Sequence, residues 1–129
     1  VVTGGHKMNI TGAFLEPTIL TGVTSDMIIA NEVVYSPVLS VLKFKSDDEA
    51  IEIANGTPYG LVAGVFTRDI NRATNAARRL RAGQVFVNEW YAGGVETPFG
   101  GYGLSGYGRE KGREALWNYV QTKNVAIKL

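Results

Sequence analysis

The feature that most limits the possible folds of this chain is a set of short segments that are apolar on both faces. Residues 38–42 and 61–66 are the clearest of them, and neither alternates polar with apolar side chains. Strands of this kind are typical of a parallel sheet that helices cover on both sides. Because helix signals separate these segments, the sequence predicts an α/β fold with a parallel sheet layered between helices.

Two of the predicted helices have clear signals at their ends. Ser46 and Glu49 form a capping box ahead of a helix that carries apolar residues at helical spacing and stops at Gly56. Asp69 caps a second helix, which ends at Gly83 and carries arginines on its polar face. The alternation of strand, helix and strand supports the same fold class.

Weaker signals predict five more elements. Thr24, Ser25 and Asp26 offer caps for one short helix. The predicted strands lie at residues 13–20, 84–88 and 124–129, and the predicted helices at residues 27–33 and 109–120.

Glycine is concentrated in one part of the chain. Eight of the 16 glycines fall between residues 93 and 112. Backbone this rich in glycine must bend sharply or pass close to another group. The cluster follows the predicted strand at residues 84–88, and α/β sheets hold ligands beyond the carboxyl ends of their strands. Spacing alone leaves two interpretations open: a pocket walled by the aromatic residues of this loop, or a packing loop that covers the end of the sheet.

One glycine pattern matches a known ligand motif but lacks its context. Residues 101–106 fit the G-x-G-x-x-G pattern of dinucleotide-binding proteins. That motif needs a strand directly before it and an acidic residue about 20 positions later. Here a turn at residues 98–100 precedes it, and no acidic residue follows Glu114. We therefore interpret the match as a result of glycine density.

Composition excludes several classes of protein. With 13 basic and 12 acidic residues the net charge is +1, so no strong field draws the chain to nucleic acid or to an anionic membrane. No apolar run approaches the ~20 residues of a membrane span, and no signal peptide is visible, so a cytoplasmic protein is expected. The chain has no cysteine and one histidine, which argues against disulfides, a thiolate nucleophile and a metal centre.

Several stretches together resemble the C-terminal portion of the NAD(P)-dependent aldehyde dehydrogenases. They occur in the order and at the spacings of that family and extend over almost the whole chain. They are residues 14–18, 37–41, 59–69, 82–88, 98–102 and 105–110.

The resemblance implies that the catalytic residues and the nucleotide domain lie in a region upstream of the part that this chain matches. Members of the family oxidise an aldehyde to a carboxylic acid with NAD or NADP, and their catalytic cysteine, general-base glutamate and nucleotide domain precede the part that this chain matches. Residues 1–121 would then be the C-terminal part of the catalytic domain, and residues 122–129 an oligomerisation strand. No catalytic residue is expected here, and the chain alone is expected to bind no NAD or NADP and to oxidise no aldehyde.

The resemblance also implies roles for five residues. Phe99 matches the pocket-wall phenylalanine of a P-F-G-G motif, and Tyr91 and Gly93 match pocket-lining positions on the preceding loop. Val33 and Tyr35 match two cofactor-binding positions in an E-E-x-F-G-P motif, where the second glutamate holds the ribose hydroxyls of the nicotinamide nucleotide. Valine accepts no hydrogen bond, so the usual grip on the cofactor is not expected at Val33.

The predicted last strand is the segment that is expected to bind a partner. Asn124–Leu129 would pair with a second copy of the chain or with the remainder of the enzyme, as an uncovered sheet edge does. Neither a nucleic acid nor a membrane is expected as a partner. A second class of function stays open, in which the chain is a non-enzymatic α/β assembly or interaction module derived from the same family.

Overall fold

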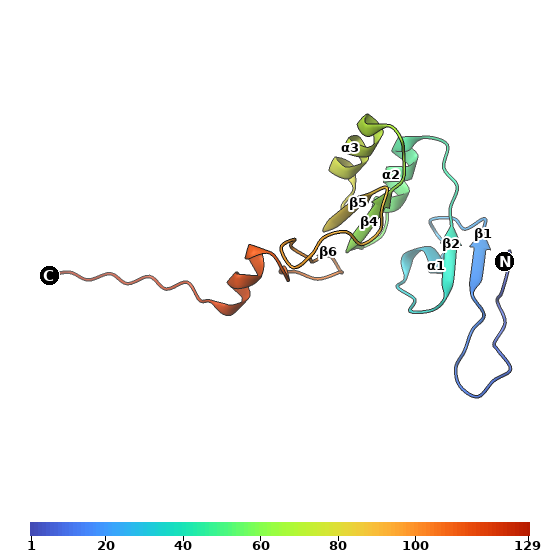
Figure 1. Ribbon diagram of the computed structural model, residues 1–129, viewed down its shortest axis with the longest axis horizontal. Coiled ribbons are helices and arrows are strands. Elements are labelled where there is room, and N and C mark those ends of the chain that lie inside the picture. Colours follow the sequence, from blue (N-terminus) through green and yellow to red (C-terminus); the bar gives the residue numbers. More distant parts are fainter. The chain divides into compact units, whose positions relative to one another are not determined.

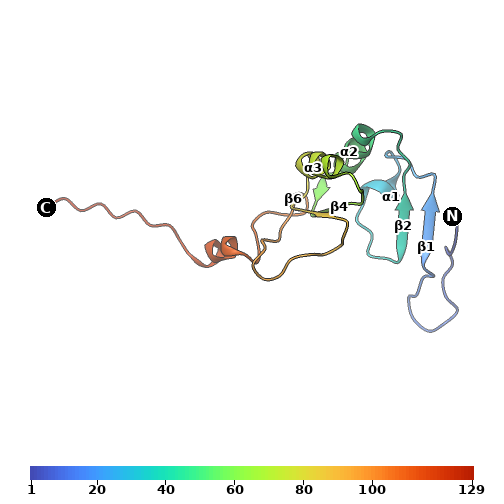
Figure 2. The same ribbon diagram turned by 45° about the horizontal axis from the view of Figure 1, so that its top comes forward.

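The computed structural model describes all residues from Val1 to Leu129 (Figures 1 and 2). The chain forms two compact units, unit 1 at Val1–Thr57 and unit 2 at Pro58–Leu129. Each unit contains parallel strands and helices, so the predicted α/β class is confirmed. The parallel strands occur as two separate pairs, one in each unit.

Unit 1 is built around the parallel pair of β1 and β2. Thr18 lies opposite Val38 at one end of the pair, and Thr21 lies opposite Val41 at the other. The N-terminal residues run beside β1 as a hairpin (Figure 1). The elements of unit 1 are β1 (Thr18–Thr21), α1 (Ile28–Asn31), β2 (Val38–Val41) and α2 (Asp47–Asn55).

The capping box of α2 forms much as the sequence predicts. The Ser46 hydroxyl accepts a hydrogen bond from the Glu49 backbone N–H at 3.2 Å. The Glu49 carboxylate reaches back to the N–H of Lys45 at 2.6 Å, one residue earlier than in the usual box. The helix buries Ile51 and ends at Gly56, as predicted.

The predicted helix at residues 27–33 shrinks to the single turn of α1. Its N-terminal residue, Met27, has no side chain that could cap the helix. The Thr24 hydroxyl instead donates a hydrogen bond to the Asp26 carboxylate at 2.5 Å. Because these two cap candidates bond to each other, the free N–H groups of the first turn gain no side-chain partner.

Unit 2 contains a strand–helix–strand crossover. β4 and β5 pair in parallel, with Val62 opposite Gln84 and Val65 opposite Val87. The helix between them, α3, contacts both strands and buries Ala73. The elements of unit 2 are β3 (Tyr59–Gly60), β4 (Val62–Val65), α3 (Ile70–Arg79), β5 (Gln84–Val87), β6 (Tyr102–Gly103) and a 3-10 helix, η1 (Arg113–Tyr119).

The helix α3 begins where the sequence predicts and for the predicted reason. The Asp69 carboxylate accepts hydrogen bonds from the backbone N–H groups of Asn71 at 2.8 Å and Arg72 at 3.2 Å. The helix ends at Arg79, and Leu80 rather than Gly83 follows it as the cap residue.

The predictions for the C-terminal region are wrong in part. In place of the helix predicted at residues 109–120 the structure has η1, which begins only at Arg113. Lys111 and Gly112 both have a φ of 58° and so cannot belong to a right-handed helix. Residues 124–129 form no strand within the chain, since no neighbouring strand pairs with them. Figure 1 shows this segment as an extended tail.

None of the helices has the length and apolar content that crossing a membrane requires.

Candidate functional site

The candidate site is the glycine-rich loop that follows β5, which we call the pocket loop (residues 88–112). Its first residue, Asn88, has a φ of 57° and turns the chain away from the sheet. The Asn88 amide accepts a hydrogen bond from the Thr67 N–H and donates one to the Thr67 carbonyl oxygen, both at 2.8 Å. This pair of bonds fixes the start of the loop to the residue that follows the adjacent strand, β4.

Aromatic side chains anchor the first part of the loop to the core of unit 2. Phe86 on β5 is 7% exposed. Its ring centroid lies 6.0 Å from that of Trp90, in an edge-to-face arrangement, and 6.5 Å from that of Tyr91. Tyr91 has a φ of 63°, so its position depends on this packing rather than on a relaxed backbone.

Gly93 lies in a turn of the loop. Its φ is 103°, and a Cβ at this position would lie 2.5 Å from the Thr97 hydroxyl oxygen. That hydroxyl donates a hydrogen bond to the Gly94 carbonyl oxygen at 3.0 Å, which closes the turn. Position 93 therefore requires glycine and contributes backbone rather than a side chain to the loop surface.

A backbone bridge closes the loop at its far end. Phe99 and Glu110 exchange two hydrogen bonds, each 2.7 Å long. The Gly112 N–H also donates to the Val95 carbonyl oxygen at 2.8 Å. Phe99 is half-buried, and these bonds fix its backbone opposite residues 110–112.

Lys111 joins the two aromatic residues that the sequence analysis assigned to a pocket wall. Its ammonium nitrogen lies 5.7 Å from the ring centroid of Tyr91 and 5.7 Å from that of Phe99. Both distances are within the range of a cation–π interaction. The structure therefore brings Tyr91 and Phe99 to one place, with Gly93 on the same loop. Sequence reasoning missed Lys111, because no local pattern links it to residues 12 and 20 positions away.

Contacts between backbones position the middle of the loop. A Cβ at Gly83, just before β5, would overlap the carbonyl oxygen of Gly100. The Gln84 side-chain amide also donates a hydrogen bond to the Pro98 carbonyl oxygen at 3.1 Å. The start of β5 and the P-F-G-G segment thus touch without intervening side chains.

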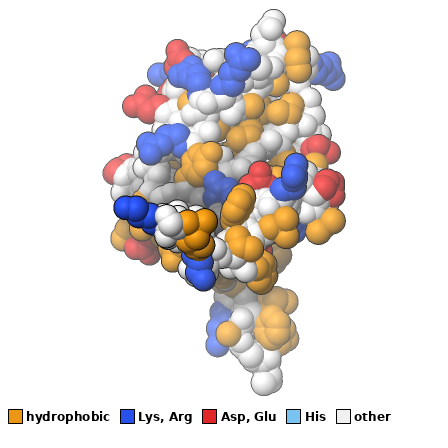
Figure 3. Space-filling model, turned by 90° about the vertical axis from the view of Figure 1, so that its left-hand side faces the viewer, with side chains coloured by type: hydrophobic (Ala, Val, Ile, Leu, Met, Phe, Trp, Pro, Cys, Tyr) orange, Lys and Arg blue, Asp and Glu red, His pale blue; other side chains and the backbone are white.

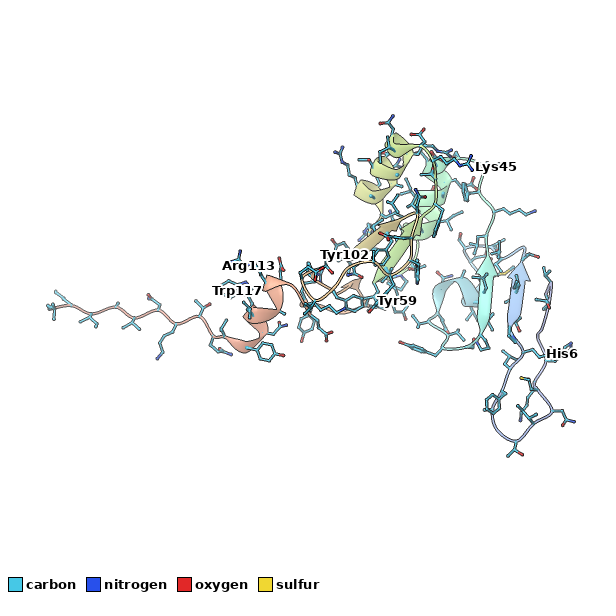
Figure 4. The ribbon with its side chains drawn as sticks, in the orientation of Figure 1. His6, Lys45, Tyr59, Tyr102, Arg113 and Trp117 are labelled. Carbon is cyan, nitrogen blue, oxygen red and sulfur yellow. The ribbon has the colours of Figure 1, made fainter.

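The G-x-G-x-x-G segment has a structural role, in agreement with its rejection as a dinucleotide motif. It contains β6, which pairs antiparallel with β3 and places Tyr102 opposite Gly60 (Figure 4 labels Tyr59 and Tyr102). The Ser105 hydroxyl accepts a hydrogen bond from the Gly60 N–H at 3.0 Å. No helix starts within or directly after the motif, so no helix N-terminus is available to a phosphate.

Arg109 supports the same segment from the other side. Its guanidinium lies 5.5 Å from the ring centroid of Tyr102. It also donates hydrogen bonds to the carbonyl oxygens of Gly101 at 3.2 Å and Gly108 at 2.6 Å. Arg109 therefore stabilises the loop from within.

An open hollow of about 380 Å³ lies at the carboxyl ends of β4 and β5, next to the start of the pocket loop. Residues that follow the two strands meet the first turns of α3 there, which is the usual place for a ligand in a parallel sheet. The lining residues are Phe66, Thr67, Arg68, Ile70, Ala73, Val87 and Asn88.

The two predicted cofactor positions lie in unit 1, between α1 and β2. Val33 is 55% exposed and Tyr35 is 99% exposed. Valine has no hydrogen-bond acceptor in its side chain, and no polar side chain takes its place at position 33. The side chain of Val33 therefore cannot hold ribose hydroxyls by hydrogen bonds as the glutamate of the family motif does.

The side chains offer no metal centre. No group of three or more His, Cys, Asp and Glu side chains is arranged to hold an ion. The single histidine, His6, lies on the exposed N-terminal segment (Figure 4).

The comparisons with known proteins identify the class to which this fold and loop belong. The profile described as "Aldehyde dehydrogenase family" matches residues 1–125, so the chain belongs to the aldehyde dehydrogenase family. Among curated relatives, aldehyde dehydrogenase 1 of Tanacetum cinerariifolium is 50% identical over 125 residues, which make up 97% of this chain and 25% of that protein. Aldehyde dehydrogenase, cytosolic 1, of Rattus norvegicus is 46% identical over 126 residues, or 98% of this chain and 25% of that protein.

Solved structures show the same relationship. The P. syringae AldA indole-3-acetaldehyde dehydrogenase, in complex with NAD+ and IAA, has a TM-score of 0.92 and 46% identity, over 99% of this chain and 26% of its own. A betaine aldehyde dehydrogenase of Staphylococcus aureus, in complex with NAD+, has a TM-score of 0.90 and 38% identity, over 95% of this chain and 26% of its own. The chain thus spans about a quarter of the length of the relatives that it matches.

Proposed function

We propose that this chain supplies one wall of the substrate pocket of an NAD(P)-dependent aldehyde dehydrogenase, an enzyme that converts an aldehyde to a carboxylic acid. The wall consists of Tyr91, Gly93 and Phe99. The chain contributes no catalytic residue of its own, because it has no cysteine to attack the aldehyde. Its contribution is to shape the space in which an aldehyde is held.

The observation that carries this proposal is the convergence of Tyr91 and Phe99 on Lys111 within one closed loop. The loop leaves the carboxyl end of a parallel strand, where α/β proteins present their ligands. Aromatic side chains on a glycine-hinged loop suit an apolar pocket. Membership of the aldehyde dehydrogenase family supplies the substrate class.

The cofactor would be held by other parts of an intact enzyme. NAD+ is present in the P. syringae and S. aureus structures, which supports NAD in this family. In this chain Val33 and Tyr35 occupy the matching positions without the ribose-binding glutamate. We expect the chain alone to bind neither NAD nor NADP.

The same proposal includes a partner for the C-terminal tail. Asn124–Leu129 would pair as a strand with a second copy of the chain or with the remainder of the enzyme. Three apolar side chains of this segment are exposed and have no packing partner in unit 2. They are Val125, Ile127 and Leu129, and exposed apolar residues on an unpaired edge favour association. A site of action in the cytosol is part of the proposal, supported by the name of the rat relative.

A chimaeric enzyme tests the pocket wall. The matching quarter of the P. syringae enzyme is replaced by this chain, and aldehyde-dependent reduction of NAD+ is measured. We expect activity in the chimaera and none in the isolated 129-residue chain. Phe99→Ala should raise the KM for the aldehyde, because it removes apolar wall surface.

Tyr107→Ala is the matched control for Phe99→Ala. Tyr107 belongs to the same loop, and its side chain is fully exposed. An equal effect of the two substitutions would contradict the wall assignment, and turnover by the isolated chain would contradict the division of labour.

The tail also distinguishes the pocket proposal from an assembly module without enzymatic function. Ile127→Pro removes a backbone N–H from the tail and should abolish self-association in light scattering, whereas Ile127→Val should retain it. A monomeric unsubstituted chain would contradict pairing between copies. A chimaera that associates but shows no activity would favour the assembly module.

A further inference from the structure

We propose that Lys111 determines the substrate class of the pocket wall, and that it favours aldehydes with an anionic group at the far end, such as a carboxylate. This inference rests on the proposed function, because it requires Tyr91 and Phe99 to face the substrate. Without Lys111 the wall would be purely aromatic. With Lys111 it carries a full positive charge beside the two rings.

The contacts of the Lys111 ammonium carry the argument. They are the rings of Tyr91 and Phe99, each at 5.7 Å from the nitrogen to the ring centroid. An aromatic face attracts a cation but accepts none of its three N–H bonds in the directional way a carboxylate does. Donors of the ammonium therefore remain available to an anion that approaches beside the rings.

The backbone around Lys111 is fixed on both sides. Glu110 exchanges two hydrogen bonds of 2.7 Å with Phe99, and the Gly112 N–H donates to the Val95 carbonyl oxygen at 2.8 Å. Between them Lys111 has a φ of 58°, a conformation that costs energy for a residue with a side chain. The loop thus holds the lysine in one place although its own backbone is strained there. Residues kept in such conformations cluster at ligand sites.

The side chain is also held in a suitable environment. Lys111 is half-buried, and its ammonium reaches the two rings. The carboxylate of Glu96 is engaged by the N–H of Gly94 at 3.2 Å, and that of Glu114 lies beside Gly112, the residue that follows Lys111. A partly desolvated cation next to aromatic surface binds an anion more strongly than one in open water. An aldehyde with a positively charged tail would instead be repelled.

The chimaeric enzyme described above provides the test, with two aldehydes of equal chain length. One is 5-oxopentanoate, which is anionic, and the other is pentanal, which is neutral. Lys111→Met keeps much of the side-chain volume and removes the charge. We expect it to lower kcat/KM for 5-oxopentanoate about tenfold more than for pentanal, mainly through KM. Lys111→Arg keeps the charge and should restore most of the preference.

Lys45→Met is the control for a general change of charge. Lys45 lies in unit 1 ahead of α2 (Figure 4) and has no place in the pocket loop. It should leave the ratio of the two kcat/KM values unchanged. An equal loss for both aldehydes in Lys111→Met would show a purely structural role for Lys111 and overturn the proposal. An unchanged ratio would overturn it as well, while activity of the chimaera with pentanal would leave the pocket wall intact.

If the chimaera does not fold, a binding measurement on the 129-residue chain tests the proposal instead. The NMR signal of the Lys111 ε-methylene group should be shifted upfield by the two rings, and Tyr91→Ala should remove part of the shift. Valerate should move this signal more than 1-pentanol at the same concentration. An unshifted methylene signal, or an equal response to both probes, would overturn the assignment.

Discussion

The strand–helix–strand crossover of unit 2 and the C-terminal region that follows it differ in a revealing way. Both have sequence signals for a helix followed by a strand. In the crossover these signals give α3 and β5. In the C-terminal region they give a 3-10 helix and an unpaired tail.

The difference lies in whether the chain itself contains the surface that each element packs against. In the crossover, β5 pairs with β4, and α3 contacts both strands. The apolar side chains of the C-terminal region remain exposed, and Figure 3 shows hydrophobic groups exposed on one face of the molecule. Examples are Leu116 at 66%, Trp117 at 73% and Ile127 at 78%. Local signals therefore produce a stable element only where a partner surface is present.

The largest expected effect comes from exchanging one aromatic residue in each region for alanine. Phe86 is 7% exposed and Trp117 is 73% exposed. Phe86→Ala should lower the free energy of unfolding by about 3 kcal/mol, because it leaves a cavity between β5 and its neighbours. Trp117→Ala should change it by less than about 0.5 kcal/mol. Urea denaturation of the two variants measures both values, and equal losses would contradict the contrast.

A smaller effect is expected where the crossover ends and the pocket loop begins. Asn88→Ala removes two hydrogen bonds to Thr67 and should cost about 1–2 kcal/mol of unfolding free energy. Asn88→Asp keeps the acceptor and loses the donor, so its loss of unfolding free energy should lie between zero and the loss in Asn88→Ala. Because Trp90 follows closely, its fluorescence should change in Asn88→Ala. No change in either measurement would show that the loop is held by other contacts.

Removal of a helix cap should have the next largest effect on the free energy of unfolding. Asp69→Ala removes the acceptor for two N–H groups of α3 and should cost about 1 kcal/mol. Ser46→Ala removes the acceptor for one N–H group of α2, so its cost should be no larger. Thermal unfolding of both variants measures the difference. A larger loss of stability in Ser46→Ala than in Asp69→Ala would contradict the expectation that the α3 cap contributes at least as much as the α2 cap.

The smallest effect on stability is expected in the turn that contains Thr24 and Asp26, just before α1. The hydrogen bond from the Thr24 hydroxyl, together with the Asp26 backbone N–H, lowers the pKa of the Asp26 carboxyl below its usual value. A lowered pKa in the folded state adds stability above the unfolded pKa, and this is lost as the pH falls through the folded pKa. Thr24→Val should therefore raise the pKa of Asp26, and any stability difference from the unsubstituted chain should shrink in acid. An NMR titration of the Asp26 carboxyl carbon checks this, and an unchanged pKa would contradict it.

The parts of the fold that could be predicted from the sequence depend on neighbours in the chain. The caps of α2 and α3 lie within three residues of the groups that they bond, and the apolar segments 38–41 and 62–65 indicate the parallel strands β2 and β4. The short α1 could not be predicted, because Thr24 and Asp26 have the residue types of caps but bond to each other. The end of the chain could not be predicted either, since a strand there needs a partner outside unit 2.

The site shows the same limit. Glycine density and position located the pocket loop, whereas the roles of Tyr91, Gly93 and Phe99 rest on the family resemblance and stay predictions. The left-handed backbone at Lys111 has no sequence signal, because hydrogen bonds of its neighbours Glu110 and Gly112 to distant residues impose it. Asn88 is of a residue type that tolerates this conformation. Lys111 lies beside Phe99 because the backbone bridge between Phe99 and Glu110 joins two stretches that are distant in the sequence.

The backbone contact between Gly83 and Gly100 has a consequence for how this loop can vary among related enzymes. Because main chain rests directly on main chain there, the P-F-G-G segment is spaced from the start of β5 by backbone atoms rather than by side chains. The side chain of Phe99 could be exchanged for another while this backbone contact and the Phe99–Glu110 bridge keep the segment in place. An alanine at position 83 would have the opposite result: its Cβ would overlap the Gly100 carbonyl oxygen and push the P-F-G-G segment away from the start of β5.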